Sequence, residues 1–467
     1  MTIGGRPALA AATFAVSDPA TEDVFAQAPD ASPEHLDAAV RAARDALPGW
    51  SALPWQQRQA LLGKLAATYM AHQEELAQLL TREQGKPLPR ARSEVAAAAH
   101  WYTEFAKMTL SDHVLQDTPQ AYVAVRRVPV GVVGAIVPWN FPIVLAAWKI
   151  APALLAGNTM VLKPSPFTPL STLRVGELLR DVLPPGVLNV LSGGDALGPW
   201  MSAHPGFDKL SFTGSTATGR SVMRSAADNL KRLTLELGGN DAAIVMPDVD
   251  VDAVAKELFW GAFVNSGQIC IAAKRVYIHE AIYDRMAQAL VALAQSTRMG
   301  PGAAEGVELG PVQNRRQYDR LVDLLDDCTR RGLTLLVGGE LPRGRGLFFP
   351  VTLVDNPPDD ARIVTEEPFG PILPLLKFRE VDEVIARANA SDYGLAGSVW
   401  CRDERQALSI ALRLQTGTVW INEIQTASPH KPMAAHKQSG VGVENGIEGL
   451  SEYTLPQTVS MRRMPAG

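Results

Sequence analysis

Short apolar runs alternate with amphipathic stretches through the middle of the chain. The runs predict strands at 132–137, 159–162, 187–191, 209–212 and 232–235, and the amphipathic stretches predict helices at 143–156, 169–182, 196–203 and 218–225. Continuous apolar strands that alternate with helices are typical of a parallel sheet covered on both faces. Such sheets bind ligands at the carboxyl ends of their strands.

A second series of the same kind begins at Asp241, and the pair Gly238-Gly239 is a plausible boundary between the two. It predicts strands at 242–245, 275–278, 334–337, 399–401 and 418–421, and helices at 251–265, 281–296 and 312–331. The chain is therefore expected to fold into two α/β units.

The N-terminal part is helical in pattern. Ser32-Pro33 is a helix start, and helices are predicted at 33–47, 55–81 and 91–108. Two further segments, 121–128 and 453–461, have the pattern of exposed strands without a neighbour. Unpaired strands of this kind commonly pair with another element or another subunit.

Length and composition exclude several classes of protein. A chain of 467 residues suggests two or three domains, and a net charge of −5 without a Lys/Arg-rich run argues against nucleic acid binding. Three separated cysteines and scattered histidines predict neither disulfides nor a metal site, and a reducing cytoplasm fits them best. The apolar stretch 130–155 is interrupted by prolines and Lys149, so no membrane span is expected.

Candidate chemistry centres on Cys270, in the stretch Asn265-Ser-Gly-Gln-Ile-Cys270-Ile. A free cysteine is more often a small buried hydrophobe than a nucleophile. A thiolate is nevertheless the strongest nucleophile among the side chains near neutral pH. Cys270 therefore needs partners elsewhere before it can be assigned a role, and Cys328 and Cys401 are interpreted as structural.

Three turns at predicted strand ends could supply those partners. Phe212-Thr-Gly-Ser-Thr-Ala-Thr-Gly219 opens a helix and suits a phosphate, although a simple helix cap fits equally well. Asn140 lies between Pro138 and Pro142 and could hold an amide donor in place, or could cap the next helix. Glu236 ends an apolar strand and could act as a general base, or could pair with a basic residue.

Taken together, these motifs resemble the aldehyde dehydrogenase superfamily over essentially the whole chain. The markers occur in order, with Lys163-Pro-Ser165 and Glu367-Pro-Phe-Gly-Pro371 added to the turns above. The resemblance implies that the Cys270 thiolate attacks an aldehyde, that Asn140 holds the oxyanion, and that Glu236 activates the water that hydrolyses the thioester. It also implies a role in proton movement for Lys149 and Glu444.

The resemblance further implies NAD as cofactor. The cofactor-binding residues it assigns are Trp139, Lys163, Ser165, Gly214, Ser215, Leu237, Glu367 and Phe369. Many NAD-using members carry Glu three residues after the lysine, where this chain has Pro166. The loss of that carboxylate predicts activity with NADP as well as NAD. A second departure, Met433-Ala434-Ala435 in place of the usual Phe-Gly-Gly, predicts a re-shaped turn near the substrate entrance.

Substrate contacts are implied at Phe141, Leu145, Trp148, Ile269 and Ile271. An apolar lining favours an aliphatic or aromatic aldehyde, because burying an unpaired carboxylate is costly. Thr426, His430 and Lys431 keep a carboxylate-bearing semialdehyde open as an alternative. A coenzyme A-acylating enzyme, a thiol hydrolase and a non-catalytic relative are further alternatives, against which the filled catalytic positions and cofactor motifs argue.

The fold implied is a Rossmann-like parallel-sheet cofactor domain, a second α/β catalytic domain and a small β oligomerisation arm. The expected bounds are 1–113 and 129–238 for the cofactor domain, 239–440 for the catalytic domain, and 114–128 with 441–467 for the arm. The arm implies a homodimer or a homotetramer.

Overall fold

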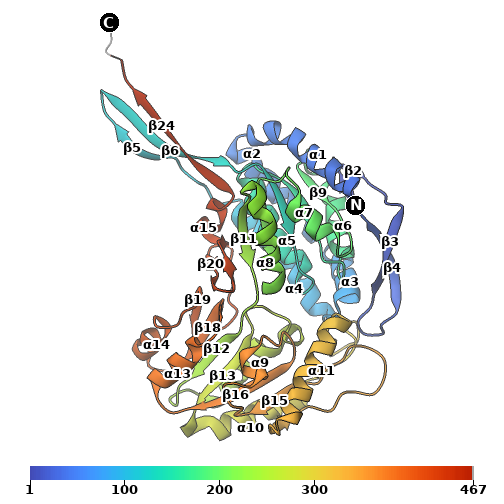
Figure 1. Cartoon of the computed structure of the whole chain (residues 1–467), viewed down its shortest axis with the longest axis vertical. Coiled ribbons are helices and arrows are strands. Elements are labelled where there is room, and N and C mark those ends of the chain that lie inside the picture. The colour runs from blue at the N-terminus through green and yellow to red at the C-terminus, as the bar shows by residue number, and fades with distance from the viewer. Residues whose placement is uncertain (465–467) are drawn as a thin grey trace.

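The computed structural model describes residues 1–464. Two α/β lobes lie one above the other, and a three-stranded arm projects from the upper lobe (Figure 1). The mixed α/β architecture expected from the alternation of apolar and amphipathic stretches is thus confirmed, and each lobe is built on its own sheet.

The sheet of the upper lobe has the strand order β2-β1-β9-β8-β7-β10-β11-β22. Its parallel centre consists of β7 (Val132–Ile136), β8 (Thr159–Lys163), β9 (Leu188–Val190), β10 (Lys209–Thr213) and β11 (Arg232–Glu236). The edges are antiparallel and are formed by β1 (Thr2–Ile3), β2 (Arg6–Pro7) and β22 (Gly440–Val441). Every residue of β7, β8, β9 and β10 is buried, which explains their unbroken apolar pattern.

Helices cover both faces of this sheet. They are α1 (Pro33–Ser51), α2 (Trp55–Ala71), α3 (Gln73–Gln84), α4 (Leu88–Phe105), α5 (Pro142–Leu155), α6 (Leu170–Leu179), α7 (Leu197–Ala203) and α8 (Thr216–Ala226). All fourteen residues of α5 are buried. This helix starts directly after β7, so it carries its first turn to the centre of the molecule.

The sheet of the lower lobe has the order β14-β15-β16-β13-β12-β18-β19. Its strands are β12 (Asp241–Val245), β13 (Ala273–His279), β14 (Leu335–Val337), β15 (Thr352–Asp355), β16 (Ile372–Phe378), β18 (Ala396–Trp400) and β19 (Thr418–Ile421). The apolar core on one face includes α9 (Val251–Phe263) and α10 (Tyr283–Ser296). The core on the other face includes α11 (Arg315–Arg330), α13 (Val381–Asn389) and α14 (Glu404–Ala411).

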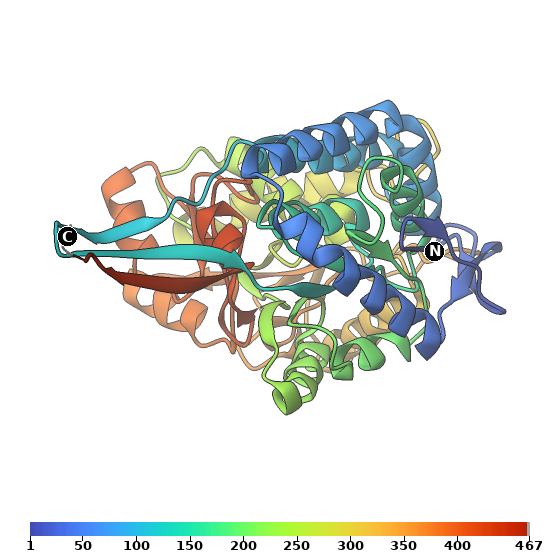
Figure 2. The ribbon, with the colours of Figure 1, turned by 90° about the horizontal axis from the view of Figure 1, so that it is seen from above.

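In the arm, the two strands for which the sequence predicted no neighbour pair with each other. It has the order β24-β6-β5, from β5 (His113–Asp117), β6 (Ala121–Pro129) and β24 (Thr454–Arg462). β24 pairs with β6 along its whole length, from Thr454 opposite Pro129 to Arg462 opposite Ala121. The hairpin of β3 (Ala12–Ser17) and β4 (Val24–Asp30) lies at the opposite end of the molecule (Figure 2). Residues 440–441 extend the first sheet, and α15 (Gly446–Ser451) precedes the arm. The expected arm residues 465–467 lie outside the described part of the chain.

Several helix boundaries differ from the prediction by two or more residues, and three of these differences have a clear physical cause. The single helix expected over 55–81 is two, because His72 leaves helical geometry (φ −113°, ψ 19°) and α3 restarts with Glu74 and Glu75 in its first turn. The helix expected to reach Asn265 ends at Phe263, because Asn265 has a positive φ. The helix expected from 312 begins at Arg315, where the Asn314 side chain accepts a hydrogen bond from the Gln317 amide at 2.9 Å.

Within residues 1–464, no helix is long and apolar enough to cross a membrane. The same part of the chain contains no group of three or more acidic, histidine or cysteine side chains arranged to hold a metal ion.

Candidate functional site

Cys270 follows a loop of unusual backbone geometry. Asn265, Ser266 and Gly267 have φ of 55°, 56° and 71°. Successive left-handed residues are strained unless the surroundings hold them. Here the Ser266 hydroxyl donates to the Gly310 carbonyl at 2.7 Å, and the Gln268 amide donates to the Asn265 carbonyl at 2.8 Å. A Cβ at Gly267 would collide with the Gly370 backbone, so the loop also needs glycine there.

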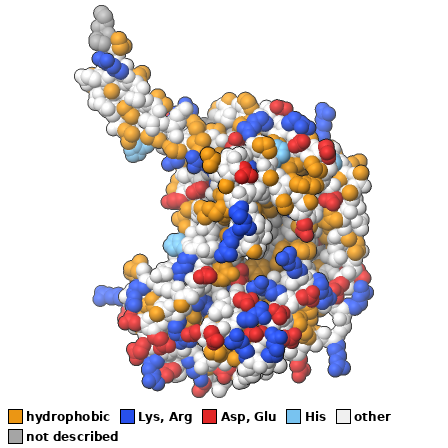
Figure 3. All heavy atoms as spheres, viewed as in Figure 1, with side chains coloured by type: hydrophobic (Ala, Val, Ile, Leu, Met, Phe, Trp, Pro, Cys, Tyr) orange, Lys and Arg blue, Asp and Glu red, His pale blue; other side chains and the backbone are white. Residues whose placement is uncertain are grey.

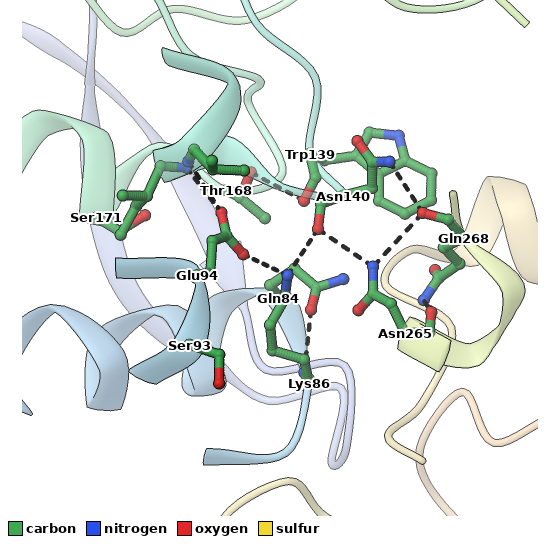
Figure 4. A network of polar contacts seen from close by, with 12 residues as sticks. Gln84, Lys86, Ser93, Glu94, Trp139, Asn140, Thr168, Ser171, Asn265 and Gln268 are labelled. Carbon is green, nitrogen blue, oxygen red and sulfur yellow. Dashed lines mark hydrogen bonds and ion pairs between the residues drawn. The ribbon is translucent and has the colours of Figure 1, made fainter. Parts of the chain in front are cut away.

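Asn140 reaches this loop from the turn between β7 and α5. Its side-chain Nδ2 donates to the Gln268 carbonyl at 2.9 Å, and its own carbonyl accepts from Asn265 Nδ2 at 3.2 Å (Figure 4). Asn140 and Cys270 line the same two cavities. The structure thus brings the predicted amide donor to the predicted nucleophile, although 130 positions separate them in sequence.

The electrostatic surroundings keep the Cys270 thiol protonated in the protein alone. Its pKa is raised to about 12, chiefly by burial; the carboxylates of Glu236, Asp241 and Glu367 also act to raise it, whereas Lys274 acts to lower it. The Lys274 ammonium donates to the Cys270 carbonyl at 2.5 Å and pairs with Glu367 at 3.1 Å. Lys274 is therefore the cation best placed to favour a thiolate.

Glu236 is a buried carboxyl group at the end of β11. Burial raises its pKa well above the ordinary value, Glu444 raises it further, and Lys149 lowers it. Its Oε1 has no hydrogen-bond partner among the described residues. A carboxyl group with a raised pKa and a free oxygen is suited to exchange protons near neutral pH.

Lys149 and Glu444 form a fully buried ion pair at 2.5 Å. Lys149 also donates to the Ser211 hydroxyl at 3.0 Å, which lies 3.2 Å from the Tyr453 hydroxyl. Because both charges influence the pKa of Glu236, the pair lies close enough to communicate with it electrically.

The predicted cofactor residues line two cavities rather than one. One, of about 280 Å³, adjoins Cys270 and contains Trp139, Gly214, Ser215, Leu237, Glu367 and Phe369. The other, of about 250 Å³, contains Lys163. Ser165 lines neither and instead accepts a hydrogen bond from the Phe167 amide.

Two features of the first of these cavities fit a dinucleotide. Ser215 caps α8 by accepting from the Thr218 amide at 3.3 Å, so the positive end of an eleven-residue helix faces the cavity. A Cβ at Gly238 would meet the Glu367 carboxylate, so glycine allows that carboxylate to lie against the backbone at the edge of the cavity. The residues present therefore fit a nicotinamide coenzyme.

The predicted substrate residues all line a third cavity, of about 340 Å³, on the other side of Cys270. Phe141, Leu145, Trp148, Ile269 and Ile271 contribute to it. Sequence reasoning missed Trp101, which stacks on Trp148 with ring centroids 5.2 Å apart. The contribution expected from Thr426, His430 and Lys431 is absent from this lining, because His430 pairs with Glu104 and Lys431 with Glu423; the same loop supplies Gln425, Ala427 and Met433.

A second buried ion pair was also missed. Lys86 pairs with Glu94 at 2.5 Å and donates to the Asn140 carbonyl at 2.9 Å (Figure 4). Glu94 in turn accepts from the Ile143 and Val144 amides in the first turn of α5. The only signal in the sequence is that Lys86 lies between Gly85 and Pro87, which suggests a backbone of fixed conformation. Nothing in the sequence indicated that Lys86 contacts Asn140.

Comparisons with known proteins agree with this geometry. A sequence model of the aldehyde dehydrogenase family matches residues 8–459. A probable aldehyde dehydrogenase of Pseudomonas sp is 44% identical, covering 99% of this chain and 94% of that protein. The phenylacetaldehyde dehydrogenase of Pseudomonas fluorescens is 39% identical, covering 98% and 95%. The NAD⁺ complex of an aldehyde dehydrogenase from Bacillus cereus has a TM-score of 0.97 at 37% identity, covering 99% and 96%.

The fold and the comparisons define an oxidoreductase, and the structure places Cys270 between a cavity whose residues fit a nicotinamide coenzyme and a mainly apolar cavity. The chain belongs to the aldehyde dehydrogenase family. It is therefore an aldehyde-oxidising enzyme that depends on a nicotinamide coenzyme, as the resemblance of its motifs predicted.

Proposed function

We propose that the protein oxidises an apolar aldehyde to the carboxylic acid through a covalent thioester on Cys270. The observation that carries this is the position of Cys270, which lines both the coenzyme cavity and the apolar cavity together with Asn140. When bound, NAD⁺ supplies the hydride-accepting chemistry, as it is bound in the Bacillus cereus relative.

The chain's own groups account for the remaining steps. The Cys270 thiol first releases its proton to water, and Lys274 favours the anion. The thiolate then adds to the aldehyde carbon, and the oxygen becomes an oxyanion beside the Asn140 amide. Loss of hydride from that carbon restores the carbonyl and leaves a thioester. Glu236, as carboxylate, then takes a proton from the attacking water. Collapse of the second oxyanion expels the Cys270 thiolate and releases the acid. Lys149 and Glu444 carry the proton away from Glu236.

Replacement of Cys270 by alanine tests this mechanism directly. Since no other side chain in the site is a comparable nucleophile, we expect NADH formation to fall to the background rate while the affinity for NAD⁺ stays near wild type. Absorbance at 340 nm and calorimetric titration measure the two. Turnover that survives in the variant would refute the assignment of Cys270.

An apolar substrate is supported by the lining of the third cavity. Its walls are mainly aliphatic and aromatic, and the Trp101–Trp148 stack forms one of them. The ammonium of Lys86, which lines the same cavity, is already engaged by Glu94 and the Asn140 carbonyl. An aliphatic or aromatic aldehyde therefore fits better than a charged one.

A semialdehyde is the second candidate, because Arg90 also lines this cavity and is exposed. A substrate carboxylate could pair with its guanidinium. Values of kcat/KM for octanal, benzaldehyde and succinate semialdehyde distinguish the two. Preference for succinate semialdehyde that disappears in an Arg90→Gln variant would favour the second candidate. Hydrolysis rather than transfer to coenzyme A is supported by the buried carboxyl group of Glu236.

We further propose that the arm joins two copies of the chain, in a dimer or a dimer of dimers. Val114, Leu115, Val459 and Met461 are between 41% and 58% exposed, and hydrophobic side chains are visible along the arm in Figure 3. Exposed apolar strands of this kind are typical of subunit interfaces. Light scattering after gel filtration would show a monomer if this is wrong. A reducing compartment such as the cytoplasm suits a nucleophilic thiol.

A further inference from the structure

The cavity around Lys163 contains one acidic side chain that no motif singled out. This cavity lies at the carboxyl ends of β8 and β9 and is lined mainly by small and apolar residues of α7 and α8. Lys163 is the single basic residue of its lining, and Asp195 is the single acidic one. A lysine and an aspartate facing one cavity provide a donor and an acceptor for a ligand with hydroxyl groups.

The backbone fixes where Asp195 lies. β8 and β9 are parallel neighbours, with Leu162 opposite Val190, so the loops after the two strands leave the sheet side by side. The Gly194 amide donates to Asp30 Oδ1 at 3.0 Å, which anchors the loop just before Asp195. Asp195 is therefore held beside Lys163 by the sheet and by Asp30.

Both polar groups have capacity left for a ligand. The Asp195 carboxylate makes no hydrogen bond or ion pair with any residue of the described range 1–464, and it is exposed. The buried Lys163 ammonium donates to the Pro164 carbonyl at 3.2 Å, which uses one of its three N–H groups. Pro166, where many NAD-using relatives carry a ribose-binding Glu, does not line this cavity.

We propose that Asp195 is the carboxylate that selects NAD over NADP in this enzyme. It accepts a hydrogen bond from a hydroxyl of the adenosine ribose and repels the phosphate that NADP carries at the 2′ position. This proposal rests on the proposed coenzyme site and deepens it. The selecting charge comes from the loop after β9, whereas Pro166 lies in the loop after β8.

The charges of the cavity oppose a 2′-phosphate. Nucleotide-binding sites that accept NADP commonly supply an arginine, and this lining contains none. The one cation, Lys163, already lies in the fields of Asp195 and Asp30, and burial lowers its pKa to about 8. At pH 8 about half of the Lys163 charge is lost, so this cation offsets a phosphate less than an unperturbed lysine would.

This proposal and the interpretation of Pro166 as a residue that permits NADP binding predict different coenzyme preferences. The absence of a carboxylate at position 166 alone predicts comparable use of both coenzymes. A carboxylate at Asp195 predicts a preference for NAD of about tenfold or more, the size expected for one repulsive charge in a partly solvated site.

The test uses two charge-neutral variants of the full-length enzyme. Asp195→Asn removes the charge in the cavity, and Asp181→Asn removes a charge of the same kind from an 82% exposed side chain at the end of α6. For each protein, kcat/KM is measured with NAD and NADP on one aldehyde. The affinities for 5′-AMP and 2′,5′-ADP, which differ by the 2′-phosphate, are measured by calorimetry.

We expect Asp195→Asn to shift both ratios about tenfold toward the phosphorylated nucleotide and Asp181→Asn to leave them at the wild-type values. Unchanged ratios in Asp195→Asn, or equal use of both coenzymes by the wild type, would overturn the proposal. Failure of the proposed function looks different, because the wild type would then turn over with neither coenzyme. The nucleotide affinities still report on Asp195 in that case.

Discussion

Two buried lysine–glutamate pairs flank the reacting centre, and they are alike in nearly every respect except their neighbours. Lys86–Glu94 and Lys149–Glu444 both have N–O distances of 2.5 Å, and no side chain among the four is more than 2% exposed. The first pair contacts backbone groups. The second contacts hydroxyl groups and lies within the electrostatic reach of Glu236.

From this difference we infer a positioning role for the first pair and a proton-transfer role for the second. Lys86 holds the carbonyl of Asn140, and Glu94 holds the amides of Ile143 and Val144, so the turn that carries Asn140, the proposed oxyanion donor, is fixed from two sides (Figure 4). Backbone amides and carbonyls cannot pass protons onward readily. The hydroxyl of Ser211, beside Lys149, both donates and accepts, so a proton can move through it.

The same energetic argument applies to both pairs. Removing one partner of a buried pair leaves an uncompensated charge and costs about 3–5 kcal/mol, whereas neutralising both is often tolerated. Experiments that compare the two pairs therefore need double variants that keep the fold and differ in the kinetic step they slow.

The largest effect is expected from Glu236→Gln, at the end of the proton path. Steady-state turnover should fall by about 10²–10⁴-fold, because glutamine cannot take the proton from water. The first turnover, which forms the thioester, should still release one equivalent of NADH per site. Stopped-flow absorbance at 340 nm measures this burst, and a variant without a burst would show that Glu236 is needed before the thioester forms.

The pH dependence has a defined sign. The raised pKa of Glu236 means that its carboxyl group is protonated at low pH and becomes a base as the pH rises. Turnover should therefore rise with pH through that pKa, and the acid limb should be absent in Glu236→Gln. The raised pKa of Glu236 also links stability to pH. Its protonated carboxyl group contributes fully to the stability of the fold at a pH below about 4.5, the pKa in the unfolded chain, and this contribution is lost as the pH rises through the pKa in the folded protein.

A smaller effect is expected at the positioning pair. In Lys86→Met/Glu94→Gln the glutamine can still accept from the α5 amides, so the main change is that the Asn140 carbonyl loses Lys86 and keeps only Asn265 as a donor. A misplaced oxyanion donor should slow the burst and the steady state by a similar factor of about 10–10², somewhat less than removal of the donor itself. A folded double variant with a wild-type burst rate would show that Lys86 has no part in positioning Asn140.

The sequence predicted more of the site than of its support. Asn140 and Glu236 follow or end strands of one parallel sheet, whose carboxyl ends lie along the same edge. Each residue alone also fitted a structural role, and only the resemblance of the ordered motifs to a known family assigned roles to them and to Cys270. The contacts of Lys86 and the position of Asp195 depend on how loops from different parts of the chain meet, and periodicity carries no information on that. β15 and β16 escaped prediction for other reasons: β15 has only four residues, and β16 contains Pro374.

The smallest effect is expected at the proposed proton-transfer pair, Lys149–Glu444. It is also the effect that best distinguishes the two buried pairs. Lys149→Met/Glu444→Gln should leave the burst rate unchanged and slow the steady state about tenfold, because only hydrolysis needs the proton carried away.

The single variants should move the acid limb of turnover in opposite directions. Without Glu444 the pKa of Glu236 falls and the limb moves to lower pH, whereas without Lys149 it rises. Urea titration identifies variants that lose the fold instead. If Lys86→Met/Glu94→Gln moved the limb as well, the two pairs would share one role, and the distinction between backbone and hydroxyl neighbours would fail.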